Sequence, residues 1–298
     1  MKWHGVVPAI TTPFSEDLSV DHGFLARHAD VLVRAGCTGI VALGSLGESA
    51  TLAFDEKLAV LTTLRAALGS RAPLVAGVAA LSTREAEALA RAAAGTGCDG
   101  LMVLPPYVYR GDDRETEAHF GAVLSATPLP CMLYNNPIAY GTDVLPARIA
   151  ALAERHRNLV AVKESSADIR RVTELRALAG DRLALFVGVD DLIVEGIAAG
   201  AVGWIAGLVN ALPGESVRLF DLARAGKGRE AAALYEWFLP LLRLDTVPKF
   251  VQLIKLVQEV VGLGSERVRP PRLALDGVER AAALRLIRNQ LALRPMAG

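Results

Sequence analysis

The sequence predicts an α/β protein, a closed (β/α)8 barrel with a C-terminal extension of three helices. Eight short apolar segments alternate with eight segments at helical spacing, which favours an all-parallel sheet. After Gly226 the strand-like segments stop and only helical segments follow. A doubly wound open sheet has the same alternation, but no G-x-G-x-x-G follows the first strand, which weakens that alternative.

The strand candidates are short and apolar, as expected for strands that are buried on both faces. We expect them at residues 5–10, 39–43, 74–77, 100–104, 131–134, 159–163, 184–187 and 201–205. Residues 35–41, 96–102 and 199–205 share a pattern of helix end, glycine and strand start. This weak repeat favours closure of the sheet into a barrel.

The helix candidates are rich in alanine, leucine and arginine, and each has one apolar face. We expect them at residues 21–35, 54–68, 83–95, 115–126, 144–154, 169–179, 191–199 and 213–225. Ser82 and Asp143 are expected to start helices, and Asp190-Asp191 is interpreted as a helix cap. Further helices at 229–243, 247–261 and 278–293 predict a division into a barrel, residues 1–226, and a helical extension, residues 227–298.

Composition excludes several classes of protein. The 298 residues are 52% hydrophobic and 21% charged, and the formal net charge of zero gives no support for binding nucleic acid or a membrane surface. Apolar runs are shorter than the roughly 18 residues of a spanning helix. The first residues do not have the pattern of a signal peptide, so we expect a cytoplasmic protein.

The cysteines and histidines do not predict a metal or disulfide site. Cys37, Cys98 and Cys131 are odd in number and widely spaced, and each borders an apolar segment, so we interpret them as small buried hydrophobic residues. The five histidines form no close pair with an acid at metal-ligand spacing.

Lys163 is the residue around which the functional prediction is built. It ends the apolar run 159–162, and no other of the six lysines follows an unbroken apolar β-like run. Burying an ammonium group is costly and lowers its pKa. A lysine at the end of a buried strand therefore either points to solvent or is placed there for its amine.

Other polar segments follow the predicted strands, and in a parallel barrel such segments meet at the carboxyl-terminal end. They are G-S-L-G-E-S at 44–49, P-P-Y-V-Y at 105–109, Y-N-N-P at 134–137, G-V-D-D at 188–191 and I-A-G at 205–207. Singly, each has an ordinary structural interpretation as a turn, a core aromatic, a helix cap or a subunit contact. Together with Lys163 they predict one site.

These residues suit Schiff-base catalysis. A lysine amine attacks the ketone of a 2-oxo acid, and the iminium ion then accepts electrons. Tyr134 can transfer protons, and the hydroxyls of Ser45 and Tyr107 can relay them to solvent. The backbone N–H groups of Ser45 and Leu46, in a glycine-bracketed turn, can hold the substrate carboxylate.

The motifs G-V-V-P-A-I-T-T-P-F at 5–14, G-S-L-G-E-S, P-P-Y, Y-N-N-P and V-K-E-S occur in order on the predicted strands. In this combination the sequence closely resembles the dihydrodipicolinate synthase/N-acetylneuraminate lyase family of class I aldolases, over nearly the whole chain. The resemblance implies a TIM barrel with three C-terminal helices, usually a homotetramer built from two tight dimers. It implies a small 2-oxo acid or imino acid substrate, and no cofactor other than the covalent lysine imine.

By resemblance, Lys163 is the Schiff-base lysine and Tyr134 the general acid/base. Ser45 occupies the relay hydroxyl position, and Tyr107 matches a relay tyrosine that the synthases contribute across a dimer interface. The expected substrate-binding residues are Ser45, Leu46, Gly47, Ala139, Gly188 and Ile205.

Two positions depart from the family pattern. Ala139 stands where the synthases have an arginine that grips the second substrate's carboxylate, and Leu46 stands where a second threonine is common. The Y-N-N-P-I-A-Y-G, K-E-S-S and F-V-G-V-D-D segments resemble a catabolic subgroup, with 1-pyrroline-4-hydroxy-2-carboxylate deaminase as the expected activity. The alternatives are 4-hydroxy-tetrahydrodipicolinate synthase, a sugar-acid 2-oxo-3-deoxy aldolase or dehydratase, a metabolite-binding barrel without catalysis, and, least favoured, a metal-dependent barrel aldolase.

Overall fold

Eight parallel strands form the centre of the computed structural model, which describes residues 2–295. The strand order is β1-β8-β7-β6-β5-β4-β3-β2, and a parallel bridge between Ala9 and Val41 joins the two end strands. The predicted (β/α)8 barrel is therefore confirmed. Its strands are β1 (Gly5–Pro8), β2 (Ile40–Ala42), β3 (Leu74–Val78), β4 (Gly100–Val103), β5 (Cys131–Asn135), β6 (Leu159–Glu164), β7 (Ala184–Val187) and β8 (Gly203–Ala206).

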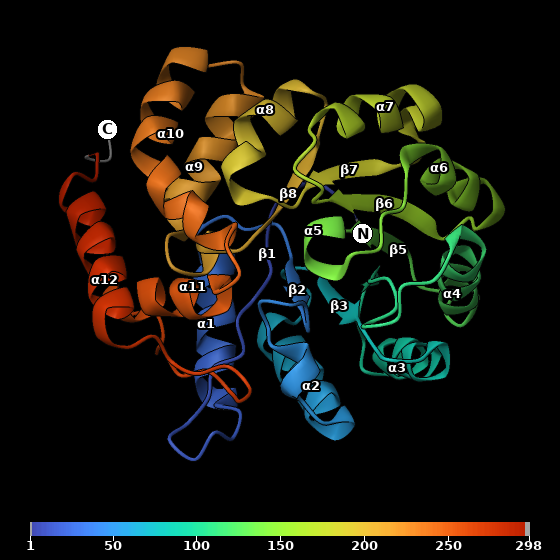
Figure 1. Cartoon of the computed structure of the whole chain (residues 1–298), viewed down its shortest axis with the longest axis horizontal. Helices are drawn as coiled ribbons and strands as arrows, with labels where there is room; N and C mark the ends of the chain where they lie inside the picture. Colours follow the sequence, from blue (N-terminus) through green and yellow to red (C-terminus); the bar gives the residue numbers. More distant parts are fainter. Residues whose placement is uncertain (1, 296–298) are drawn as a thin grey trace.

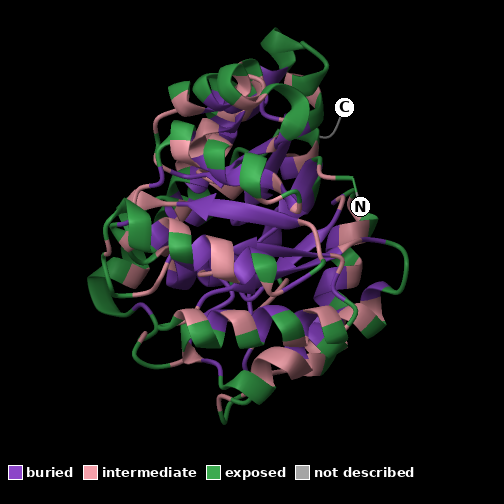
Figure 2. Ribbon diagram, turned by 90° about the vertical axis from the view of Figure 1, so that its right-hand side faces the viewer, coloured by how far each residue is buried: buried purple, intermediate pink, exposed green. Residues whose placement is uncertain are grey.

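Helices surround the strands and cover them from solvent (Figure 1). Except for α5, which has no buried residue, each of these helices turns its apolar side to the barrel, so the strands are buried while the helices alternate between buried and exposed residues (Figure 2). They are α1 (His22–Arg34), α2 (Phe54–Leu68), α3 (Thr83–Gly95), α4 (Asp113–Ser125), α5 (Pro137–Tyr140), α6 (Pro146–Arg155), α7 (Arg170–Ala179), α8 (Ile193–Ala198) and α9 (Pro213–Arg224). Short 3-10 turns are η1 (Ser49–Thr51), η2 (Gly180–Arg182), η3 (Asp190–Leu192), η4 (Leu208–Asn210) and η5 (Arg243–Asp245).

The predicted three-helix extension is present as α10 (Gly228–Leu242), α11 (Phe250–Val260) and α12 (Gly277–Ala292). In Figure 1 these orange and red helices gather beside α9 and α1 at one side of the barrel. α10 packs on α9, and α12 packs on both α10 and α11. The η5 turn between α10 and α11 carries Asp245 toward Gly207, at the end of β8.

Two of the three predicted helix caps are wrong. Ser82 does cap α3, because its hydroxyl accepts from the N–H of Glu85. Asp143 does not start α6, because that helix begins three residues later at Pro146, and proline suits the first helical turn. Asp143 instead forms an ion pair with Arg171. Asp190 is fully buried and accepts from the loop after β8 instead of capping α8.

Within residues 2–295 we find no helix that is long and apolar enough to cross a membrane.

Candidate active site

Lys163 and Tyr134 lie side by side at the barrel mouth, by which we mean the carboxyl-terminal strand ends and the loops that follow them. Lys163 on β6 is in register with Tyr134 on β5, so the two side chains point the same way. Both are nearly buried, with 6% and 5% of their surface exposed. The Nζ of Lys163 lies 4.1 Å from the centre of the Tyr134 ring.

Gly188 leaves the space that the Lys163 side chain occupies. A Cβ atom at Gly188 would lie 2.4 Å from Cε of Lys163 and 2.0 Å from Oγ of Ser165. The Ser165 hydroxyl is buried and has no hydrogen-bond partner among residues 2–295. The glycine at the end of β7 is thus required by close approach, and an unpaired hydroxyl lies beside the lysine stem.

The turn after β2 carries Ser45, Leu46 and Gly47. Its geometry is fixed because Thr12 donates to the carbonyl of Gly47 at 2.6 Å. Leu46 is buried, and the backbone N–H groups of Ser45, Leu46 and Gly47 have no acceptor within the described part of the chain. Three N–H groups without an acceptor in one turn are donors of the kind that a carboxylate binds.

Tyr140 joins the predicted hydroxyls and was not assigned a role from the sequence. Its hydroxyl hydrogen-bonds with Oγ of Ser45. Its ring centre lies 5.7 Å from that of Tyr134 and 5.3 Å from that of Tyr107. Ser45, Tyr107, Tyr134 and Tyr140 therefore form one group, which we call the hydroxyl cluster. The sequence does carry a signal for this position. Asn136 followed by Pro137 is a typical helix start, and it predicts the short helix α5 that carries Tyr140.

Two acidic side chains approach the mouth from the β8 side. Asp190 accepts from the backbone N–H groups of Gly207 and Leu208 and from the Trp204 indole. Burial raises the pKa of Asp190 to about 6, although these donors and Lys163 oppose the shift. Asp245 lies against Gly207, and burial, together with the charge of Asp190, raises the pKa of Asp245 well above its ordinary value.

The remaining predicted residues take less direct positions. Ile205 is buried on β8, in register with Val7 of β1. Ala139 is exposed on α5, and its N–H donates to the Asn136 side chain. Its methyl group offers no hydrogen bond to a carboxylate.

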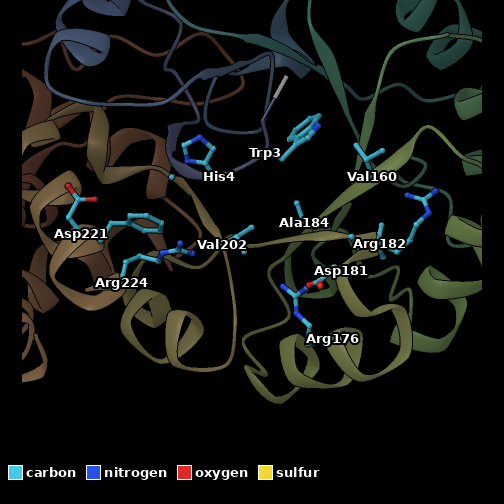
Figure 3. Close-up of a pocket in the computed structure, with 13 residues that line it drawn as sticks. Trp3, His4, Val160, Arg176, Asp181, Arg182, Ala184, Val202, Asp221 and Arg224 are labelled. Carbon is cyan, nitrogen blue, oxygen red and sulfur yellow. The ribbon is translucent and has the colours of Figure 1, made fainter. Parts of the chain in front are cut away.

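A separate hollow of about 580 Å³ opens at the opposite end of the barrel, where the strands begin (Figure 3). Its lining includes Gly5 at the start of β1 and Ala184 at the start of β7. Arg182, also in the lining, donates to the backbone carbonyls of Leu159 and Ala153. None of the predicted site residues lines this hollow, so the candidate site is the mouth around Lys163.

The comparison with protein families agrees with this geometry. The model of the dihydrodipicolinate synthetase family matches residues 2–290. The chain belongs to this family. As a member it is a lyase of the class I aldolase type, a group of enzymes that hold their substrate as a lysine imine without a metal or other cofactor.

Relatives in the dihydrodipicolinate synthetase family match along nearly their whole length. The 4-hydroxy-tetrahydrodipicolinate synthases of Pelobacter propionicus and Synechococcus sp. are 32% and 36% identical, covering 96% and 93% of this chain and 98% and 92% of theirs. The structure of the synthase from Methylacidiphilum fumariolicum SolV has a TM-score of 0.91 at 28% identity, covering 98% of both chains. A prophage protein of the family from E. coli K12, solved with pyruvate, has a TM-score of 0.91 at 27% identity, covering 98% of this chain and 99% of its own.

Proposed function

We propose that Lys163 forms a Schiff base with the 2-oxo group of pyruvate or a closely related 2-oxo acid. The observation that carries the proposal is the nearly buried Nζ of Lys163, 4.1 Å from the centre of the Tyr134 ring at the barrel mouth. The amine attacks the ketone carbon, a C–N bond forms, and the ketone oxygen leaves as water after proton transfer.

The surrounding residues support this role. The free N–H groups of the turn Ser45-Leu46-Gly47 suit the substrate carboxylate. The hydroxyl of Tyr134 suits the proton transfers at the carbinolamine and at the substrate C3. Gly188 leaves free the space that the Lys163 side chain occupies, and the buried Ile205 is an apolar residue of β8.

The first candidate reaction is condensation of the bound pyruvate with aspartate semialdehyde, the 4-hydroxy-tetrahydrodipicolinate synthase reaction. The names of the relatives favour it over deamination of 1-pyrroline-4-hydroxy-2-carboxylate.

A second candidate is cleavage or dehydration of a hydroxylated 2-oxo acid. Ala139 favours it, because the second carboxylate of a synthase substrate has no guanidinium there. Assaying wild type and Ala139→Arg with aspartate semialdehyde separates the two candidates. A strong wild-type rate selects condensation, whereas a rate that appears only in Ala139→Arg selects the second candidate.

Borohydride trapping tests the Schiff base itself. The protein is incubated with pyruvate, reduced, digested and mapped by mass spectrometry, with Lys163→Ala and the surface variant Lys249→Ala in parallel. We expect an adduct on Lys163 in wild type and Lys249→Ala, and none in Lys163→Ala. Wild-type protein without an adduct for pyruvate or any small 2-oxo acid would contradict the proposal.

The expected homotetramer and the cytoplasmic location belong to the same proposal. Both rest on the family to which the chain belongs. Light scattering of the purified protein checks the first, and fractionation of the source cells checks the second.

A further inference from the structure

The inner face of the barrel mouth has a glycine at the end of each of the neighbouring strands β7 and β8. Lys163 on β6 is in register with Phe186 of β7, and Phe186 is in register with Gly203 of β8. Residues in register point to the same side of a sheet, as do alternate residues along a strand. Gly188 and Gly207, at even spacing from Phe186 and Gly203, therefore face the side to which Lys163 points.

A side chain from another element occupies the space beside each of these glycines. A Cβ atom at Gly188 would lie 2.4 Å from Cε of Lys163, and a Cβ atom at Gly207 would lie 2.0 Å from Oδ1 of Asp245. No residue with a side chain fits at Gly207 while Asp245 keeps this position. The carboxyl of Asp245 thus lies where a residue of the β8 end would otherwise point into the mouth.

Asp245 lies farther out along the mouth than the Lys163 stem. Val187 of β7 pairs with Trp204 of β8, so Gly207 is two residues farther out than Gly188. Two residues of strand rise about 6.6 Å. A substrate held on Lys163 by its 2-oxo carbon would therefore extend its far end toward the carboxyl of Asp245.

The η5 turn of the C-terminal extension holds Asp245 in this place. The backbone N–H and the hydroxyl of Thr246 both donate to the carbonyl of Arg243, at 3.2 Å and 3.0 Å, and Leu244 is buried. The turn packs on η3, which follows β7. The Arg243 guanidinium pairs with Asp191, 3.5 Å away, and not with Asp245. The turn therefore presents the carboxyl of Asp245 to the mouth without neutralising it.

Asp190, the other carboxyl beside Gly207, is held by the protein itself. It accepts from the backbone N–H groups of Gly207 at 3.1 Å and Leu208 at 2.8 Å, and from the Trp204 indole at 2.9 Å. No donor within residues 2–295 hydrogen-bonds in this way with Asp245. Asp190 is thus engaged in positioning the loop after β8, whereas the carboxyl of Asp245 is free to bind a ligand.

The charges around Asp245 favour a hydroxyl group as its partner. Burial and the charge of Asp190 raise the pKa of Asp245 well above its ordinary value, against the opposing charge of Lys163. A protonated carboxyl both donates and accepts hydrogen bonds, and a hydroxyl group does the same. A second carboxylate on the substrate only accepts and is repelled once Asp245 is ionised, and an alkyl end leaves the carboxyl unpaired.

We propose that Asp245 binds a hydroxyl group on the carbon chain of the substrate beyond C3, so that the site selects hydroxylated 2-oxo acids. The inference rests on the proposed function, because Lys163 holds the 2-oxo end of the same substrate. It adds the residue that binds the opposite end, and it gives the C-terminal extension a direct contact with substrate. It agrees with cleavage or dehydration of a hydroxylated 2-oxo acid, the second candidate reaction.

Borohydride trapping with two acids that differ by one hydroxyl tests this contact. 4-Hydroxy-2-oxobutyrate and 2-oxobutyrate have the same carbon chain, and the mass of the reduced adduct on Lys163 identifies the acid that was bound. The half-saturating concentration for trapping is measured for both acids and for pyruvate, in wild type, Asp245→Ala and Asp245→Asn. Asp181→Asn, at an exposed aspartate on the far end of the barrel, is the matched control.

We expect wild type to bind 4-hydroxy-2-oxobutyrate about tenfold more tightly than 2-oxobutyrate, as one added hydrogen bond to a carboxyl allows. Asp245→Ala should lose this preference, and its binding of pyruvate should weaken much less than its binding of the hydroxylated acid. Asp245→Asn keeps a donor and an acceptor and should retain part of the preference. Asp181→Asn should show the wild-type preference.

Wild type that traps pyruvate but binds the two longer acids equally would overturn the role of Asp245 and leave the imine intact. The wild-type preference in Asp245→Ala would overturn it too, because another residue would then bind the hydroxyl. So would an Asp245→Ala variant that binds all three acids equally poorly, because Asp245 would then be structural. If wild type traps none of the acids, the proposed function fails and this inference with it.

Discussion

The Nζ of Lys255 lies 2.5 Å from Oε1 of Glu48, and neither side chain is open to solvent, with exposures of 2% and 0%. Glu48 belongs to the G-S-L-G-E-S turn after β2, and Lys255 belongs to α11 of the extension. Glu48 also accepts from the backbone N–H of Arg269 at 3.0 Å. The extension thus holds in place the turn that carries Ser45, which ties the C-terminal helices to the proposed site.

Replacing Lys255 by methionine should destabilise the protein strongly. The substitution leaves the Glu48 carboxylate buried with fewer partners, which costs about 3–5 kcal/mol when one member of a buried pair is removed. Urea unfolding measures this free energy. The surface variant Lys249→Met loses only an exposed pair with Glu279 and should cost less than about 1 kcal/mol. Equal effects of the two substitutions would contradict a structural role for the buried pair.

His28 should make the protein sensitive to mild acid. Burial lowers the pKa of His28 from 6.5 to about 4, so the folded state holds the neutral ring. The contribution of neutral His28 to the free energy of unfolding is complete above the unfolded pKa of 6.5. It is lost progressively as the pH falls from 6.5 through the folded pKa of about 4.

The difference in unfolding free energy between about pH 7 and about pH 5 should shrink by about 2 kcal/mol in His28→Gln. Chemical unfolding at the two pH values measures it. The same pH dependence in the variant and in wild type would show that His28 is not the responsible group.

Gly188→Ala should impair imine formation without unfolding the barrel. The new Cβ would lie 2.4 Å from Cε of Lys163, so the lysine side chain must leave its present position. Because misplacing a reactive group by about 1 Å costs on the order of 100-fold, we expect a loss of that size in the pyruvate trapping rate. Gly214→Ala on α9 is the control, since nothing lies within 4 Å of its added Cβ, and it should trap normally. Normal trapping in Gly188→Ala would show that the Lys163 side chain can move aside and still react.

Asp245→Asn should change which 2-oxo acids the mouth accepts. The pKa of Asp245 is raised, so its carboxyl becomes negative at a higher pH than an exposed aspartate, and it then repels a second carboxylate on the substrate. Wild type should therefore disfavour 2-oxoglutarate relative to pyruvate increasingly as the pH rises, by about tenfold over the titration.

Borohydride trapping at a series of pH values measures this preference. In Asp245→Asn the preference should be flat with pH, and the exposed control Asp181→Asn, at the far end of the barrel, should follow wild type. If the preference still depended on pH in Asp245→Asn, the pH dependence would belong to another titrating group.

Much of the site could be predicted because strand ends are local features of the sequence. An apolar run that stops at Lys163, and another that stops at Tyr134, indicate residues at the carboxyl-terminal ends of buried strands. Once the strands are parallel and in a barrel, those ends must meet. The prediction failed for Asp143 and Asp190, because their partners, Arg171 and the loop after β8, come from elements distant in sequence.

The sequence by itself determined the barrel, the three added helices and the placement of Lys163 and Tyr134. The spacing of the apolar residues and the order of the elements along the chain are enough to specify these. Only the tertiary structure revealed Tyr140 in the hydroxyl cluster, Asp245 beside Gly207 and Lys255 against Glu48. Each of these contacts joins elements far apart in the chain, and side-chain direction and closure of the barrel decide them. No local pattern encodes the buried pair of Lys255 and Glu48, which lie 207 positions apart in the sequence and are brought together by packing alone.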